Sequence, residues 1–235
     1  LNYMKTIASR GLLYTTTGRF ALADEYTAKA LQLREEKLGN TNMAVAASLN
    51  NYAVLHYNLG KYNESEKEFN DAIAVIKTNK LQEAMPYAIV LNNQAMLYQS
   101  MGNYEAAVKV LLQAMTLSAK LESAKARNQL KFLSNLALLY QQMGKYAEAE
   151  KIYLELDKKL DKGKPEQANM LNNYAILSLL MKKEDKVESM LKQSTGIYKS
   201  SMGESSPAYA KVISDLGNFY RHKARYAEAE PLLQQ

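Results

Sequence analysis

The stretch LNNYAVLHYNLGKY, Leu49 to Tyr62, sets two adjacent asparagines inside an apolar segment that runs into a glycine turn. Asparagine is a mediocre helix former, because its short amide competes for backbone hydrogen bonds. The near-copy LNNYAIL, Leu171 to Leu177, repeats the arrangement, so something other than helix propensity maintains these asparagines. The i, i+3, i+4, i+7 spacing of an amphipathic helix is nevertheless followed by Leu49, Tyr52, Ala53 and His56.

The turn glycine of this stretch belongs to an internal repeat. Glycines recur 42 residues apart, each followed by an aromatic residue two positions later, at Gly18, Gly60, Gly102 and Gly144. The same frame places Lys182 at a fifth turn, 38 residues on, and Ala224 at a sixth after another 42. A fixed period of this length is typical of stacked repeats in which one supersecondary unit recurs.

Small residues stand at two fixed positions around each turn, which indicates that two helices approach each other closely in every unit. Before the turn these are Gly11, Ala53, Ala95, Ala137, Ala175 and Gly217, and after it Ala23, Ser65, Ala107, Ala149, Val187 and Ala229. The segment after Tyr62 has a second helical stripe, and no strand-type alternation occurs. We therefore predict an all-α protein with two helices per unit.

The residues of these units resemble the tetratricopeptide repeat, in the long variety found in kinesin light chain. LREEKLGNTNMAVAASLNNYAVLHYNLGKYNESE, Leu33 to Glu66, is similar to that family's pattern, and so is Ile197 to Gln234. The resemblance implies a right-handed α-solenoid of about six stacked helix-turn-helix repeats in a single domain. The expected units are residues 1–38, 43–80, 85–122, 127–162, 166–200 and 207–235.

The sequence departs from the family pattern in its linkers and in its fifth unit. The linkers around Pro86 and Arg127 lose the linker signature of the family. The fifth unit has lost one helical turn and has MKKED, Met181 to Asp185, where the others have a glycine turn, so we expect it to be the least regular and to bend the superhelix. Since the sequence begins and ends inside helical segments, we also expect a fragment of a longer protein.

The face opposite the core of the first helix is not an ordinary charged surface. In the unit of the opening stretch it holds Asn51 and Val54, and other units place asparagine beside an aliphatic residue in the same way. An amide offers both a donor and an acceptor, so regularly spaced asparagines can pair with the backbone of an extended peptide. The alternative, which stays open, is that these asparagines only bond to neighbouring helices and fix the superhelical pitch.

The resemblance implies that the asparagines contact the backbone of a ligand in a concave groove. The matching positions are Asn51, Asn93, Asn135 and Asn173, with Asp215 in the sixth unit. The groove would also include Val54, Met96, Leu138, Ile176, Asn218, Lys131 and Lys211. For the first asparagine of each pair, a place at the flank shared with the next repeat is favoured: Asn50, Asn92 and Asn172. We expect His56 to be a core residue rather than a ligand.

Composition argues against catalysis. The chain has no cysteine and two histidines, and it lacks a phosphate loop, a nucleophile elbow and a His-Glu-x-x-His motif. We therefore expect no enzyme, no metal and no cofactor. The net charge of +6 comes from 30 basic and 24 acidic residues without a long basic run, which argues against nucleic acid as a partner. No apolar run approaches the length of about 18 residues that membrane insertion needs.

The sequence thus predicts a cytoplasmic protein-protein interaction scaffold that binds a partner peptide or helix. A regulatory or sensor domain of a larger enzyme or signalling protein is the main alternative, and a nucleic-acid-binding solenoid is a third. Self-association is a further expectation, because solenoid ends without polar caps can stack on one another.

Overall fold

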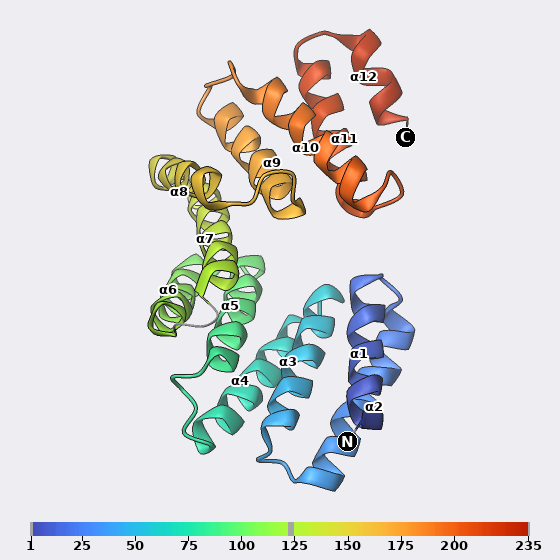
Figure 1. The fold of residues 1–235 in the computed structure, drawn as a ribbon, viewed down its shortest axis with the longest axis vertical. Coiled ribbons are helices and arrows are strands. Elements are labelled where there is room, and N and C mark those ends of the chain that lie inside the picture. The colour runs from blue at the N-terminus through green and yellow to red at the C-terminus, as the bar shows by residue number, and fades with distance from the viewer. Residues whose placement is uncertain (1, 122–124, 235) are drawn as a thin grey trace. The chain divides into compact units, whose positions relative to one another are not determined.

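The computed structural model describes residues 2–121 and 125–234, without the side chains of residues 125–127. In this part of the chain all regular structure is α-helical, and Figure 1 shows the helices as successive antiparallel pairs. The first helices of the pairs are α1 (Asn2–Thr16), α3 (Met43–Asn58), α5 (Met85–Ser100), α7 (Lys125–Gln142), α9 (Pro165–Leu180) and α11 (Pro207–His222). The second helices are α2 (Phe20–Leu38), α4 (Tyr62–Thr78), α6 (Tyr104–Lys120), α8 (Tyr146–Lys159), α10 (Val187–Met202) and α12 (Tyr226–Leu233).

These pairs confirm the all-α solenoid fold, and their limits lie within a few residues of the predicted units. The predicted limits at 1, 122 and 235 fall outside the described residues, and so does the linker side chain of Arg127. The chain divides into two compact units, Leu1–Phe132 and Leu133–Gln235. A single continuous domain therefore stays a prediction.

Each turn between paired helices has the same hydrogen bonds. In the second pair Gly60 N–H donates to the Tyr57 carbonyl at 3.0 Å, and Lys61 N–H donates to the His56 carbonyl at 2.9 Å. This is the Schellman arrangement, which needs a left-handed residue after the helix. Gly60 supplies it with φ 73° at no steric cost. The glycine period of the sequence is therefore a period of helix ends.

The fifth turn keeps this geometry without glycine. Lys182 takes φ 59°, and Lys183 N–H donates to the Ser178 carbonyl at 2.8 Å. The following helix, α10, then starts only at Val187, five residues after Lys182, whereas α4 starts two residues after Gly60. This late start agrees with the expected irregularity, while the predicted bend of the superhelix stays a prediction.

The missing turn lies elsewhere than the sequence indicated. Helix α8 of the fourth pair has 14 residues against 17 in α4 and α6, while α9 of the fifth pair has 16, as α3 and α5 have. The prediction that the fifth unit loses a turn is therefore wrong in its location. The glycine spacing could not distinguish the two, because it spans both α8 and α9.

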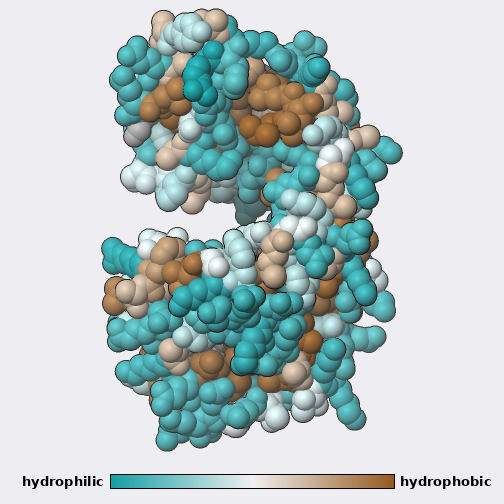
Figure 2. Space-filling view, turned by 180° about the vertical axis from the view of Figure 1, so that it is seen from behind, coloured by the Kyte–Doolittle hydropathy of each residue, from teal (hydrophilic) through white to brown (hydrophobic). Residues whose placement is uncertain are grey.

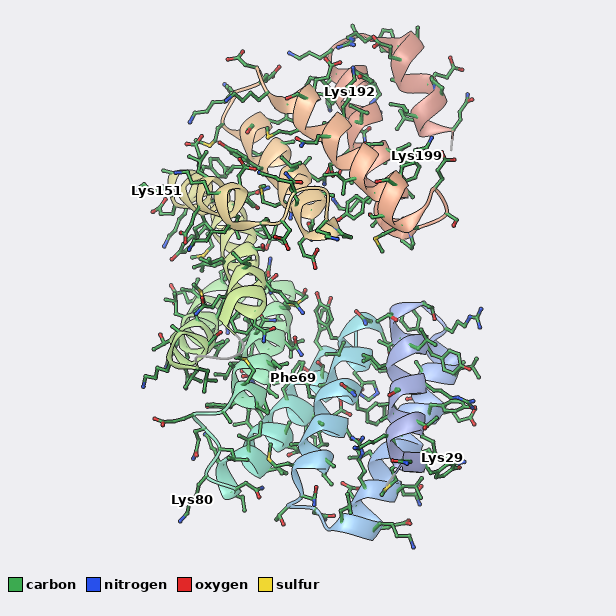
Figure 3. The ribbon with its side chains drawn as sticks, viewed as in Figure 1. Lys29, Phe69, Lys80, Lys151, Lys192 and Lys199 are labelled. Atoms are coloured by element: carbon green, nitrogen blue, oxygen red, sulfur yellow. The ribbon has the colours of Figure 1, made fainter. Side chains whose placement is uncertain are left out.

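The predicted small residues form the contact between paired helices. In the second pair Ala53 and Ser65 have no exposed surface, and Ser65 Oγ donates to the Ala53 carbonyl at 2.8 Å. Phe69, which is 1% exposed, lies inside the same pair, where Figure 3 shows it among the helices. Burying such a side chain contributes about 1.5–3 kcal/mol. All twelve predicted small residues are buried.

Candidate functional site

In the first unit, the first helices of successive pairs approach one another directly. Helix α3 contacts both α1 and α5, whereas within the described residues α4 has no comparable contact with α2 or α6. A stack of helix pairs whose first helices lie closer together than its second helices is curved, with the first helices on the inner side. The exposed stripes of α3 and α5 therefore lie on the inner side of this unit.

We call these two stripes the inner face. Asn51 and Val54 of α3 are half-buried, and so are Asn93 and Met96 of α5. Half-burial means that each side chain is held by its neighbours and still presents surface to a ligand. The inner face as a whole comprises Ala47, Asn51, Val54 and Asn58 of α3 with Ile89, Asn93, Met96 and Ser100 of α5.

Neutral hydrogen bonds join α3 to α5 along this face. Asn93 Nδ2 donates to Asn50 Oδ1 at 3.0 Å, and the hydroxyls of Tyr57 and Ser100 lie 3.1 Å apart. Both pairs are separated by 43 residues, one more than the repeat period. The repeat period alone did not predict this contact, because neighbouring first helices meet at a register of one residue more than the period.

The two asparagines of the α5 pair are also linked to each other, because Asn92 Nδ2 donates to Asn93 Oδ1 at 3.3 Å. Asn93 thus uses both ends of its amide within the protein, which agrees with the alternative that such asparagines join neighbouring repeats. Asn51 differs: among the described residues its amide has no hydrogen-bond partner. Of the paired asparagines on α3 and α5, Asn51 is therefore the one whose amide is best placed to serve a ligand.

In the second unit, the equivalent contact between neighbouring first helices, which we call the seam, includes a charged residue. Asn172 Nδ2 of α9 donates to Asp215 Oδ2 of α11 at 2.9 Å, again over 43 residues. The same carboxylate oxygen accepts a bond from Lys211 Nζ at 3.0 Å, within α11. Asn173 donates to Asn169 Oδ1 one turn earlier at 2.9 Å. Asp215 and Lys211, which the sequence placed in the groove, thus neutralise each other.

The remaining predicted groove residues lie on three helices. Lys131 of α7 belongs to the first unit and is exposed. The others belong to the second unit and are half-buried: Asn135 and Leu138 of α7, Ile176 of α9 and Asn218 of α11. The described structure thus places half-exposed amide and aliphatic side chains in each unit, and the continuity of the stripe from one unit to the other stays a prediction.

His56 lies in a polar cluster between helices, as expected for a core residue. It is 8% exposed, its Nδ1 lies 3.0 Å from Glu68 Oε2, and its ring packs on Tyr52 with centroids 4.5 Å apart. Tyr52 in turn donates to Asp24 Oδ1 at 3.0 Å. Burial, with the bond to Asp24, raises the pKa of Tyr52 to about 12, and burial raises the pKa of Glu68. The cluster ties α2, α3 and α4 together.

A charged cluster fixes the last three helices of the second unit. Arg225 Nη1 donates to Glu188 Oε2 at 2.6 Å, and its guanidinium lies 4.3 Å from the ring centroid of Tyr220. Lys192 Nζ lies 2.7 Å from Glu188 Oε1. The bond from Arg225, and next that from Lys192, lowers the pKa of Glu188 to about 2. Every member has a partner, so the cluster is structural.

Other candidate sites are weak in the described residues. Within them there is no group of three His, Cys, Asp or Glu side chains able to hold a metal ion. Two open hollows, of about 490 Å³ at Gly60–Glu64 and about 430 Å³ between α11 and α12, contain none of the groove asparagines. None of the described helices has the length and apolar character that crossing a bilayer requires.

Comparison with known proteins identifies the repeat. The family model described as tetratricopeptide repeat matches residues 4–78 and 86–156. No curated protein matches the chain in sequence. Among solved structures, the chain is similar to BtubC (BKLC) from P. vanneervenii, with 20% identity, a TM-score of 0.69 and coverage of 92% of this chain and 87% of that one.

Two further structures share the fold. TPR-like repeats of Podosopora anserina assigned to kinesin light chain are 18% identical, with a TM-score of 0.65 and coverage of 85% of this chain and 97% of that one. Aspartyl phosphate phosphatase F from Bacillus subtilis is 13% identical, with a TM-score of 0.69 and coverage of 99% and 58%. Given the family match over more than half of the residues, the chain belongs to the tetratricopeptide repeat family.

Proposed function

We propose that the protein is an interaction scaffold that holds an extended peptide or a helix of a partner protein on the exposed stripes of its first helices. The tetratricopeptide repeats support a protein-interaction role in general, and proteins of this family are generally scaffolds rather than catalysts. The solved structure of the Cut9-Hcn1 hetero-tetramer, which resembles this chain at a TM-score of 0.68 and 14% identity, is itself a protein assembly.

The observation that carries the proposal is the half-exposed amide of Asn51 beside Val54 on α3. Its donor and acceptor have no partner in the described protein, so both are available to the N–H and C=O groups of a ligand backbone. Val54 and Met96 add apolar surface that a ligand side chain can bury, at about 25 cal/mol per Å². A polar anchor beside apolar surface is the usual composition of a peptide site.

The experiment compares Asn51→Ala with Asn63→Ala, a matched change at an exposed position in the first turn of α4. An array of peptides of about ten residues is probed with each purified variant. We expect Asn51→Ala to lose most of the peptides that the wild type binds, and Asn63→Ala to keep them. Equal binding by all three proteins would contradict the proposal.

The other roles predicted from the sequence have weaker support. A nucleic-acid interface would need clustered basic residues, yet the first helices α3 and α5 contain no Lys or Arg, and Lys211 is paired with Asp215. Service as a regulatory domain of a larger protein is compatible with the same peptide site. Self-association through the ends, the predicted cytoplasmic location and membership of a longer protein remain predictions.

A further inference from the structure

The inner face of the first unit carries no charge. Helices α3 and α5 contain no Asp, Glu, Lys or Arg, in a chain of which 23% is charged. Burial does not explain this, because Ala47, Asn58 and Ser100 are exposed and Ile89 is 38% exposed. Exposed helix positions are ordinarily occupied by charged residues.

The charges of the unit lie on the second helices and on the first helices that flank α3 and α5, with Lys5 and Arg10 on α1 and Lys131 on α7. Helix α4 alone contains Glu64, Glu66, Lys67, Glu68, Asp71 and Lys77. Of the lysines labelled in Figure 3, Lys29 lies on α2 and Lys80 follows α4. Figure 2, which views the molecule from behind, shows patches of apolar surface among hydrophilic residues. Among the first helices of this unit, the lack of charge is therefore confined to α3 and α5.

The fold does not require this neutrality. In the second unit, the position equivalent to Asn93 is Asp215, which accepts the corresponding seam bond from Asn172 and pairs with Lys211. A charged seam is thus compatible with the same contact between first helices. The uncharged face of α3 and α5 consequently needs a reason other than packing.

A ligand supplies that reason. When a charged side chain is pressed against a neutral surface, it loses water and gains no counter-charge, which costs free energy. Backbone amides lose little there, since Asn51 can pair with them, and aliphatic side chains gain by covering Val54, Met96 and Ile89. We infer that the inner face selects an extended segment of a partner protein whose contacting residues are uncharged. This inference rests on the proposed peptide-binding function.

The test uses the full chain and three sets of synthetic peptides of about ten residues, matched in length and apolar content: uncharged, acidic and basic. Affinities are measured at about 50 mM and about 500 mM salt, which screens exposed charges strongly. We expect the uncharged set to bind best, with affinities that change less than about twofold over this range. A preference for the acidic or the basic set, with affinity falling steeply with salt, would overturn the inference and leave the proposed function standing. Absence of binding by all three sets would overturn both.

A pair of lysine variants tests whether the ligand binds on the inner face. Ala47→Lys adds one positive charge to the inner face at an exposed helical position, and Ala74→Lys adds the same charge at an exposed position of α4. Lysine is a good helix former, so both variants should keep the wild-type circular dichroism spectrum. We expect Ala47→Lys alone to improve binding of acidic peptides by several-fold and to make it sensitive to salt. An unchanged preference in Ala47→Lys, or the same shift in both variants, would contradict a ligand on the inner face.

Discussion

The two asparagines of the LNN sequence make different contacts in this protein. Two of the first asparagines bond to the next repeat: Asn50 accepts from Asn93, and Asn172 donates to Asp215. The second asparagines differ from one another. The Asn93 amide hydrogen-bonds within the protein, whereas the Asn51 amide has no hydrogen-bond partner among the described residues. The near-copies at residues 49 and 171 therefore conserve a contact between repeats as well as a surface.

This division predicts opposite effects on stability. Asn93→Ala removes the bonds to Asn50 and Asn92, so the free energy of unfolding should fall by about 1 kcal/mol. Asn51→Ala removes no bond and replaces asparagine by a better helix former, so stability should stay within about 0.5 kcal/mol of the wild type or rise slightly. Urea unfolding followed by circular dichroism measures both. A loss in Asn51→Ala equal to that in Asn93→Ala would show that both asparagines are structural.

Two glycines inside helices give a second pair of variants with opposite expected effects on stability. A Cβ at Gly11 would lie 2.5 Å from Thr27 Oγ1 and 3.2 Å from the Thr27 backbone nitrogen, so Gly11→Ala must push α1 from α2 and should cost about 1–3 kcal/mol. A Cβ at Gly196 in α10 meets nothing within 4 Å, so Gly196→Ala should gain up to about 1 kcal/mol from helix propensity. Thermal midpoints compare the two variants. A stabilised Gly11→Ala would mean that the pair is packed more loosely than described.

Glu188 predicts how stability depends on pH. Arg225 and Lys192 lower its pKa to about 2, below that of an unfolded glutamate. A lowered pKa stabilises the fold fully above the unfolded value of about 4.3, and this contribution is lost as the pH falls towards about 2. Since the Glu188 side chain is 32% exposed, solvent reduces the size of the effect.

The variant Glu188→Gln should therefore lower the thermal midpoint at neutral pH and flatten its decline between about pH 5 and about pH 2. Glu204→Gln, which removes an exposed carboxylate of the same unit, is the control and should follow the wild-type profile. Identical profiles for both variants would show that the Arg225 cluster contributes nothing to stability.

At the scale of the element, the turns show how far sequence reasoning reaches. Glycine at a fixed period predicted the helix ends, because a left-handed residue there is a local requirement that the sequence displays. The lost turn was misplaced, because removing residues from α8 or from α9 gives the same spacing of Gly144 and Lys182. The seam between first helices was missed, because it depends on the register of elements more than 40 residues apart.

Lys182 keeps the left-handed turn at a cost that can be measured. At φ 59° its Cβ approaches the following carbonyl, which costs about 1–2 kcal/mol for a residue other than glycine. Lys182→Gly should therefore stabilise the protein by about 1 kcal/mol, after allowing for the greater freedom of glycine in the unfolded chain. Gly102→Ala, in a turn with φ 76°, should destabilise it similarly. Chemical unfolding tests both, and a destabilised Lys182→Gly would imply that the lysine side chain supports the turn.

At the scale of the whole molecule, the sequence predicted the all-α repeat fold, because the fold follows from periodicity, while the place of the ligand site stays a prediction. It did not predict which asparagines are already bonded, since that depends on contacts between repeats. The segregation of charge was visible in the sequence of α3 and α5, but its meaning required knowing that parts of these helices are exposed. Two consequences follow for the whole protein: it should bind peptides, and this binding should be insensitive to salt.

The most direct test of the central claim is nuclear magnetic resonance of the asparagine side-chain amides during titration with the best-binding uncharged peptide. Asn51 and Asn93 report from the inner face, whereas Asn63 and Asn79 are exposed at the two ends of α4. The account predicts that the Asn51 signals move most, that the Asn93 signals move with them, and that those of Asn63 and Asn79 stay in place. Saturable binding that shifts Asn63 or Asn79 and leaves Asn51 unmoved would contradict it.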